Sequence, residues 1–176
     1  MLDFTEYTKI FISLFAILDP IGMIPVIILF TASLSPQKRA HVGRLASLTV
    51  GGILLVALLI GEPLLAFFGI SINSFRVAGG ILLMLMAITM LQGNVYKPVP
   101  TVEGNVDIES TAAHAIVPLS TPLLAGPGSI SAVILEAHKV HSIQHYLIMS
   151  LEIILLSVTV WLTFLAAPWV AQCLGK

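Results

Sequence analysis

Long apolar runs separated by short polar stretches fill most of this chain. Five runs can be traced, over residues 8–34, 45–60, 70–91, 112–135 and 146–170. None alternates with a period of two, so helices are favoured over strands. Several approach the ~20 residues that a helix needs to cross a bilayer. The pattern predicts an all-α membrane protein, a polytopic helical bundle of about five transmembrane segments.

Proline, glycine and serine mark where these helices should begin and end. Ser35 followed by Pro36 is typical of a helix start, because serine caps the free N–H groups and proline suits the first helical position. Gly61–Pro63 should interrupt the second segment, leaving a short apolar piece that ends at Gly69. The polar stretch 92–111 has the composition of a loop that joins two halves.

Two apolar runs carry internal breaks. Leu18–Pro25 contains an aspartate, a glycine and two prolines inside the first run, and Leu124–Ile130 contains Gly-Pro-Gly in the fourth. Proline lacks a backbone N–H and disrupts a helix. A carboxylate in hydrocarbon is costly and usually functional. We therefore expect the two breaks to face each other and form the working site.

The landmarks of the first half recur in the second at a nearly constant distance. Asp19-Pro20 corresponds to Gly126-Pro127, 107 residues later, and Pro63 corresponds to Pro168, 105 residues later. An odd number of segments per unit would insert the copies with opposite orientation, as in many secondary transporters. We therefore predict two inverted repeats: a three-helix unit at 1–91, a polar inter-repeat loop at 92–111, and a second unit at 112–176. The second unit has two helices, so the last expected helix is missing. Either the chain is a truncated form or a five-helix form is genuine.

Composition supports a membrane location. Of the 176 residues, 57% are hydrophobic and 10% are charged, against roughly 25% charged residues in soluble domains. The mean hydropathy is +1.03. The net charge of −1 gives no basic footprint for nucleic acid. Lys38, Arg39 and Arg44 follow the first run, so this loop should be cytoplasmic and the N-terminus periplasmic.

No enzymatic or cofactor motif stands out. The chain has no nucleotide-binding loop, plausible catalytic triad or zinc motif. His138, His141 and His145 follow Glu136 at near-helical spacing, but a metal site needs several converging ligands. This stretch is interpreted as a solvated loop, so no metal site is predicted. The single cysteine, Cys173, excludes an intrachain disulfide.

The breaks suggest how a solute could be held. As an N-cap, Asp19 would start a half-helix with Pro20 at its first position, and Pro25 would free the carbonyl of Ile21. Helix N-termini bind carboxylates, while free carbonyls and Asp19 could bind an ammonium group, a cation or a proton. Alternatively, Asp19 only caps its helix and pairs with a hydroxyl or with Arg76. The residues expected to line a substrate or ion pathway are Asp19, Pro20, Gly22, Pro25, Thr121, Pro122, Gly126, Pro127, Gly128 and Ser129, with Arg76 and Glu152 as charge partners.

Three motifs together resemble the MarC family of bacterial inner-membrane proteins, namely Leu18–Pro25, Phe75–Ile81 and Val117–Ile130. The resemblance spans nearly the whole chain. It implies a six-helix protein of the plasma (inner) membrane, and some relatives are described as neutral amino-acid transporters. The function expected is secondary transport of a small solute coupled to H⁺ or Na⁺. The alternative is a non-transporting scaffold or accessory subunit.

Overall fold

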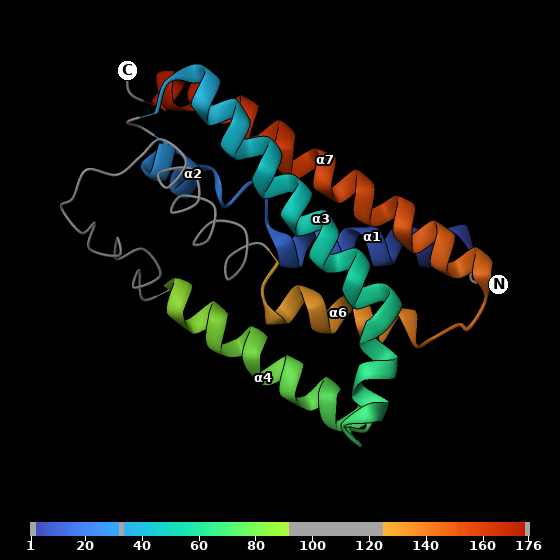
Figure 1. The fold of residues 1–176 in the computed structure, drawn as a ribbon. Coiled ribbons are helices and arrows are strands. Elements are labelled where there is room, and N and C mark those ends of the chain that lie inside the picture. Colours follow the sequence, from blue (N-terminus) through green and yellow to red (C-terminus); the bar gives the residue numbers. More distant parts are fainter. Residues whose placement is uncertain (1–2, 32–33, 92–124, 175–176) are drawn as a thin grey trace.

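The computed structural model describes residues 3–31, 34–91 and 125–174. Every regular element in these ranges is a helix, so the predicted all-α class is confirmed. Figure 1 shows the helices as a bundle with α4 at its edge. Their bounds are α1 Phe4–Leu18, α2 Ile24–Thr31, α3 Pro36–Phe67, α4 Ile72–Leu91, α6 Pro127–Ala137 and α7 Ile143–Leu174.

The helices α3 and α7 form the centre of the bundle. They lie side by side and run in opposite directions (Figure 1). Small residues allow the close approach: a Cβ added at Gly43 would lie 2.7 Å from Cβ of Phe164, and one at Gly51 would lie 2.9 Å from Oγ of Ser157. Ser157 also donates a hydrogen bond of 2.6 Å to the carbonyl of Ser47. Small residues and interhelical hydrogen bonds are the usual means of helix association in a membrane.

Because of this contact, alanine substitutions at two glycines of α3 should have different effects on the stability of the protein. Gly43→Ala should lower the free energy of unfolding by ~1–3 kcal/mol, because Cβ of Phe164 can move only with the α7 backbone. Gly52→Ala should be neutral or slightly stabilising, because nothing lies within 4 Å of its added Cβ. Thermal unfolding of both variants in detergent measures the difference. Equal melting temperatures would show that α3 and α7 do not pack as described.

The two long helices have the same spacing along the chain as the landmarks of the predicted repeat. The helix α7 begins 107 residues after α3 begins (143 against 36) and ends 107 residues after α3 ends (174 against 67). The helix α2 packs on α7, and α6 packs on α3. Exchanged packing of this kind is expected when two copies of one unit are related by a twofold axis. Since residues 92–124 lie outside the described ranges, the division into units stays a prediction.

The boundaries of α3 confirm one prediction and correct another. Ser35 is the N-cap, its hydroxyl accepts from the N–H of Lys38 at 3.4 Å, and Pro36 opens the helix as predicted. The predicted interruption at Gly61–Pro63 is wrong, because α3 continues to Phe67. It ends instead at Gly69, whose φ of +67° is left-handed. The N–H of Ile70 bonds back to the carbonyl of Leu65 at 2.9 Å, an ending in which glycine is favoured.

The exterior of the bundle is apolar. Large side chains on α3, α4 and α7 are more than half exposed, among them Leu48, Val77, Met84 and Leu151. Among the described residues, two helices, α3 and α7, are long and apolar enough to cross a membrane. The segments with breaks are shorter pieces: α1 has 15 residues, α2 has 8 and α6 has 11. The helices α1 and α2 together correspond to the first predicted segment. The helices α3, α4 and α7 correspond to the second, third and fifth, and α6 corresponds to the described end of the fourth.

Polar contacts fix both ends of the bundle. At one end, the buried ring of His145 lies 3.0 Å from the carbonyl of Glu136 through Nε2 and 3.2 Å from the hydroxyl of Tyr7 through Nδ1. Because a carbonyl only accepts, Nε2 carries a proton, and in the neutral imidazole the tyrosine hydroxyl donates to Nδ1. At the other end, the guanidinium of Arg39 donates to the carbonyl of Thr31, the last residue of α2, at 2.8 Å. The N-terminus of α1 and the α6–α7 connection therefore share one end.

Candidate functional site: two adjoining helix breaks

The first break joins α1 to α2. Asp19 has φ 41° and ψ 58°, so the chain turns sharply in the left-handed region, which aspartate tolerates better than most residues. The carboxylate accepts a hydrogen bond of 3.0 Å from the N–H of Gly22. A side chain at Gly22 would collide with this carboxylate. The absence of a side chain at Gly22 therefore allows the carboxylate of Asp19 to lie against the turn and accept this hydrogen bond.

Two predictions about this break need correction. Asp19 is the C-cap of α1, and its backbone is left-handed instead of extended as an N-cap requires. The second piece begins at Ile24, so Pro20 belongs to the turn and Pro25 to the first turn of α2, where proline is tolerated. The carbonyl of Ile21 is not free, because it accepts from the N–H of Ile24 at 3.0 Å. The carboxylate of Asp19 does accept a backbone hydrogen bond, from Gly22 within the turn and not from the start of α2.

The second break follows the predicted pattern more closely. Gly126 is the N-cap of α6, with extended backbone angles of φ −75° and ψ 175°, and Pro127 opens the helix. The hydroxyl of Ser129 donates back to the carbonyl of Gly126 at 3.0 Å. The side chain of Ser129 is buried. Thr121 and Pro122, which were predicted to belong to the same site, lie outside the described residues.

The structure brings the two breaks together. The helices α1 and α6 pack on each other, and a Cβ added at Gly128 would lie 3.9 Å from Cγ2 of Ile17 in the last turn of α1. Gly128 also receives the side chain of Leu83 from α4, with no room for a Cβ. The carboxyl end of α1 thus lies beside the amino end of α6, so the negative end of one helix dipole adjoins the positive end of another.

The proposed charge partners lie elsewhere. Within the described ranges, no ion pair joins Arg76 to a carboxylate, and its side chain is exposed on α4. Glu152 is the tenth residue of α7 and is only 7% exposed, so it lies deeper than its sequence position indicated. Its Oε2 atom has no hydrogen-bond partner among the described residues. Asp19, in contrast, is exposed, and its carboxylate accepts a hydrogen bond from the N–H of Gly22.

A groove of about 560 Å³ runs between α3 and α7, away from the two breaks. Small residues line its floor, including Ser47, Gly51, Gly52 and Ser157, and Arg44 and Trp161 lie along it. Its walls are mainly apolar. A groove of this composition on the exterior suits a lipid chain better than a polar solute, so we do not assign it to the solute pathway.

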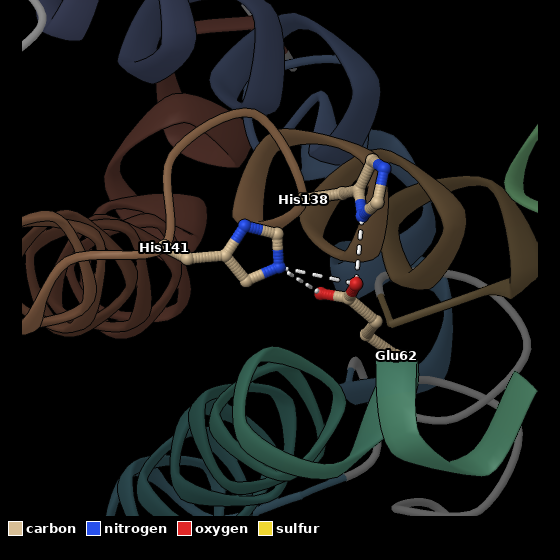
Figure 2. A group of neighbouring side chains, drawn as sticks. All are labelled: Glu62, His138 and His141. Atoms are coloured by element: carbon tan, nitrogen blue, oxygen red, sulfur yellow. Dashed lines mark hydrogen bonds and ion pairs between the residues drawn. The ribbon is translucent and has the colours of Figure 1, made fainter. Parts of the chain in front are cut away.

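One cluster of side chains was not predicted from the sequence. Glu62 of α3 meets His138 and His141 from the α6–α7 connection (Figure 2). His145, which the sequence groups with these histidines, points into the bundle instead. The histidine spacing was visible, but the carboxylate comes from 76 residues earlier than His138. Only the packing of α6 on α3 brings the three together.

An apolar exterior, paired long helices and interrupted helices define the class of this protein as a helical integral membrane protein. The model of the MarC family of integral membrane proteins matches residues 4–176. The chain belongs to this family.

The relatives agree with this assignment. The chain is 41% identical over 174 residues to a UPF0056 membrane protein of Buchnera aphidicola subsp. Acyrthosiphon pisum, covering 99% of this chain and 81% of the relative. It is 37% identical to the UPF0056 membrane protein YhcE of Escherichia coli strain K12, with the same coverage. A UPF0056 membrane protein of Methanocaldococcus jannaschii is 36% identical, covering 99% of this chain and 85% of the relative. No solved structure matches the chain.

Proposed function

We propose that this protein is a secondary transporter of a small polar solute, with a neutral amino acid as the solute class and H⁺ or Na⁺ as the coupling ion. The observation that carries the proposal is the approach of the α1–α2 break to the start of α6, where a Cβ added at Gly128 would lie 3.9 Å from Cγ2 of Ile17. Discontinuous helices that meet inside a membrane protein are typical of solute sites in transporters. Transport, not catalysis, is the activity proposed.

The charges of the two breaks match a zwitterion. Backbone N–H groups and the positive dipole end at the start of α6 suit a carboxylate. The carbonyl end of α1 and the carboxylate of Asp19 suit an ammonium group or a cation. A neutral amino acid carries both groups within a few ångströms of each other. The exposure of Asp19 is compatible with access by solute and by the coupling ion.

The same proposal includes a location. Lys38, Arg39 and Arg44 lie at the amino end of α3, opposite the end that holds the N-terminus of α1. Positive residues favour the cytoplasmic side. We therefore place the protein in the bacterial plasma (inner) membrane as a multi-pass protein with a periplasmic N-terminus.

Uptake by proteoliposomes tests the function. Purified protein should accumulate labelled alanine, serine or glycine above the level of empty liposomes, and an inward H⁺ or Na⁺ gradient should increase the rate. The transported solute should also raise the melting temperature of the protein, since a ligand bound to the folded state stabilises it by mass action. No uptake across the panel, together with cross-linking to one stoichiometric partner, would favour the alternative role as a scaffold or accessory subunit.

A further inference from the structure

Glu62, His138 and His141 form a compact cluster at the end of the bundle that holds the α6–α7 connection. Glu62 Oε1 lies 2.7 Å from Nδ1 of His138 and 3.1 Å from Nε2 of His141, and Glu62 Oε2 lies 3.1 Å from the same Nε2. Figure 2 shows both imidazole rings pointing toward the one carboxylate. The side chains are part-exposed, at 26% for Glu62, 42% for His138 and 61% for His141. An ion can therefore reach the cluster from water.

We propose that Glu62, His138 and His141 bind a divalent transition-metal ion of the Zn²⁺ type. The three donor atoms all lie within 4.8 Å of one another. Ligands at ~2.0–2.1 Å from a tetrahedral Zn²⁺ are roughly 3.3 Å apart. The observed separations of 2.7 and 3.1 Å need to widen by about 0.6 and 0.2 Å, and the two imidazole nitrogens already lie within 4.8 Å of each other. Exchanging hydrogen bonds for metal bonds therefore requires small side-chain movements.

The donor set selects the kind of ion. Two imidazole nitrogens and one carboxylate suit Zn²⁺, Co²⁺, Ni²⁺ or Cu²⁺, whereas Mg²⁺ and Ca²⁺ prefer a shell of oxygen atoms. Three protein ligands leave a position for water. His138 is the C-cap of α6, where the helix dipole favours positive charge. The neighbouring cation is Lys139, whose Nζ lies 2.7 Å from Oε2 of Glu136. Because it is paired with Glu136, it does not neutralise the carboxylate of Glu62.

The ion would join two parts of the chain that are far apart in sequence. Glu62 lies in the last two turns of α3, while His138 and His141 belong to the connection between α6 and α7. A bound ion fastens this connection to α3, next to the contact between α3 and α6. The inference does not depend on transport, because the cluster is separate from Asp19 and from the start of α6.

Metal titration tests this site. The protein is purified with an affinity tag that contains no histidines, so that the tag does not bind the metal. After dialysis against a chelator, Zn²⁺ should bind with one equivalent per chain in competition with a chromophoric chelator, and Zn²⁺ should raise the melting temperature. Glu62→Gln and His141→Gln should weaken binding by ~10–100-fold or more. Both variants should fold, because Gln keeps an acceptor for the histidines and His141 is exposed.

His41→Gln is the matched control, since His41 is exposed on the first turns of α3, far from the cluster in sequence. It should bind Zn²⁺ as the unaltered protein does. Two results would overturn the proposal: no stoichiometric Zn²⁺ binding by the unaltered protein, or unchanged affinity in His141→Gln. Equally tight binding of Mg²⁺ or Ca²⁺ would also contradict it.

Discussion

Asp19→Asn is expected to abolish solute uptake while leaving the protein folded. Asparagine keeps a side-chain oxygen that can accept from the N–H of Gly22, as the aspartate does at 3.0 Å. It also tolerates the left-handed angle of φ 41° at this position. What it loses is the negative charge that would bind an ammonium group or a coupling ion. A hydrogen bond to a charged group contributes ~1.5–3 kcal/mol, so uptake should fall by at least about tenfold.

The measurement is initial uptake of labelled solute by proteoliposomes with matched protein content, alongside the melting temperature in detergent. Asp3→Asn is the control, because Asp3 is an exposed carboxylate at the start of the same helix. It should retain full uptake. If Asp19→Asn transports at the control rate, Asp19 serves only to cap the turn, and the ion-coupling role proposed for it is wrong.

Local signals in the sequence were sufficient for several elements of the fold. Ser35-Pro36 marked the start of α3, because capping depends on neighbouring residues alone. The run from 70 to 91 matched α4, Ile72–Leu91, closely. The distance of 107 residues between Asp19-Pro20 and Gly126-Pro127 also separates α3 from α7 at both ends. The helix start and the helix run follow from local propensity, whereas the internal repeat stays a prediction.

Other features depend on energies that local pattern does not reveal. Pro63 was expected to end α3, but a proline near the end of a long helix removes only one backbone hydrogen bond, and packing on α6 and α7 maintains the helix. The glycine that does end it, Gly69, adopts positive φ. Asp19 followed by Pro20 has the sequence of a helix start, yet the backbone at Asp19 is left-handed and ends α1.

The candidate site likewise has some features that the sequence predicts and others that depend on how the helices pack. The two breaks could be found from proline, glycine and aspartate in apolar runs, since each is anomalous in its own segment. The proximity of Ile17 to Gly128 follows from helix packing. The cluster of Glu62 with His138 and His141 could not be found, because the histidines lie 76 and 79 residues after Glu62 and no sequence signal connects them. Its partners become visible only when α6 lies against α3.

Glu152→Met is expected to stabilise the protein. Glu152 is 7% exposed among fully buried apolar neighbours such as Met149 and Ile153. One carboxylate oxygen lacks a hydrogen-bond partner among the described residues. Methionine has a similar volume without the desolvation cost. Replacing buried ionisable groups by apolar side chains can stabilise by ~1–4 kcal/mol, which should raise the melting temperature in detergent.

Glu6→Met, on the N-terminal turn of α1, is the control for this change, and it should alter stability by no more than ~0.5 kcal/mol. A lower melting temperature for Glu152→Met would show that the carboxylate has a stabilising partner.

The stabilised variant should also take up solute more slowly. A buried acidic residue in a membrane helix costs folding free energy and is usually functional, so we propose that Glu152 takes part in moving ions or protons although it lies away from the two breaks. Full uptake by Glu152→Met would remove Glu152 from the ion pathway and leave Asp19 as its acidic group.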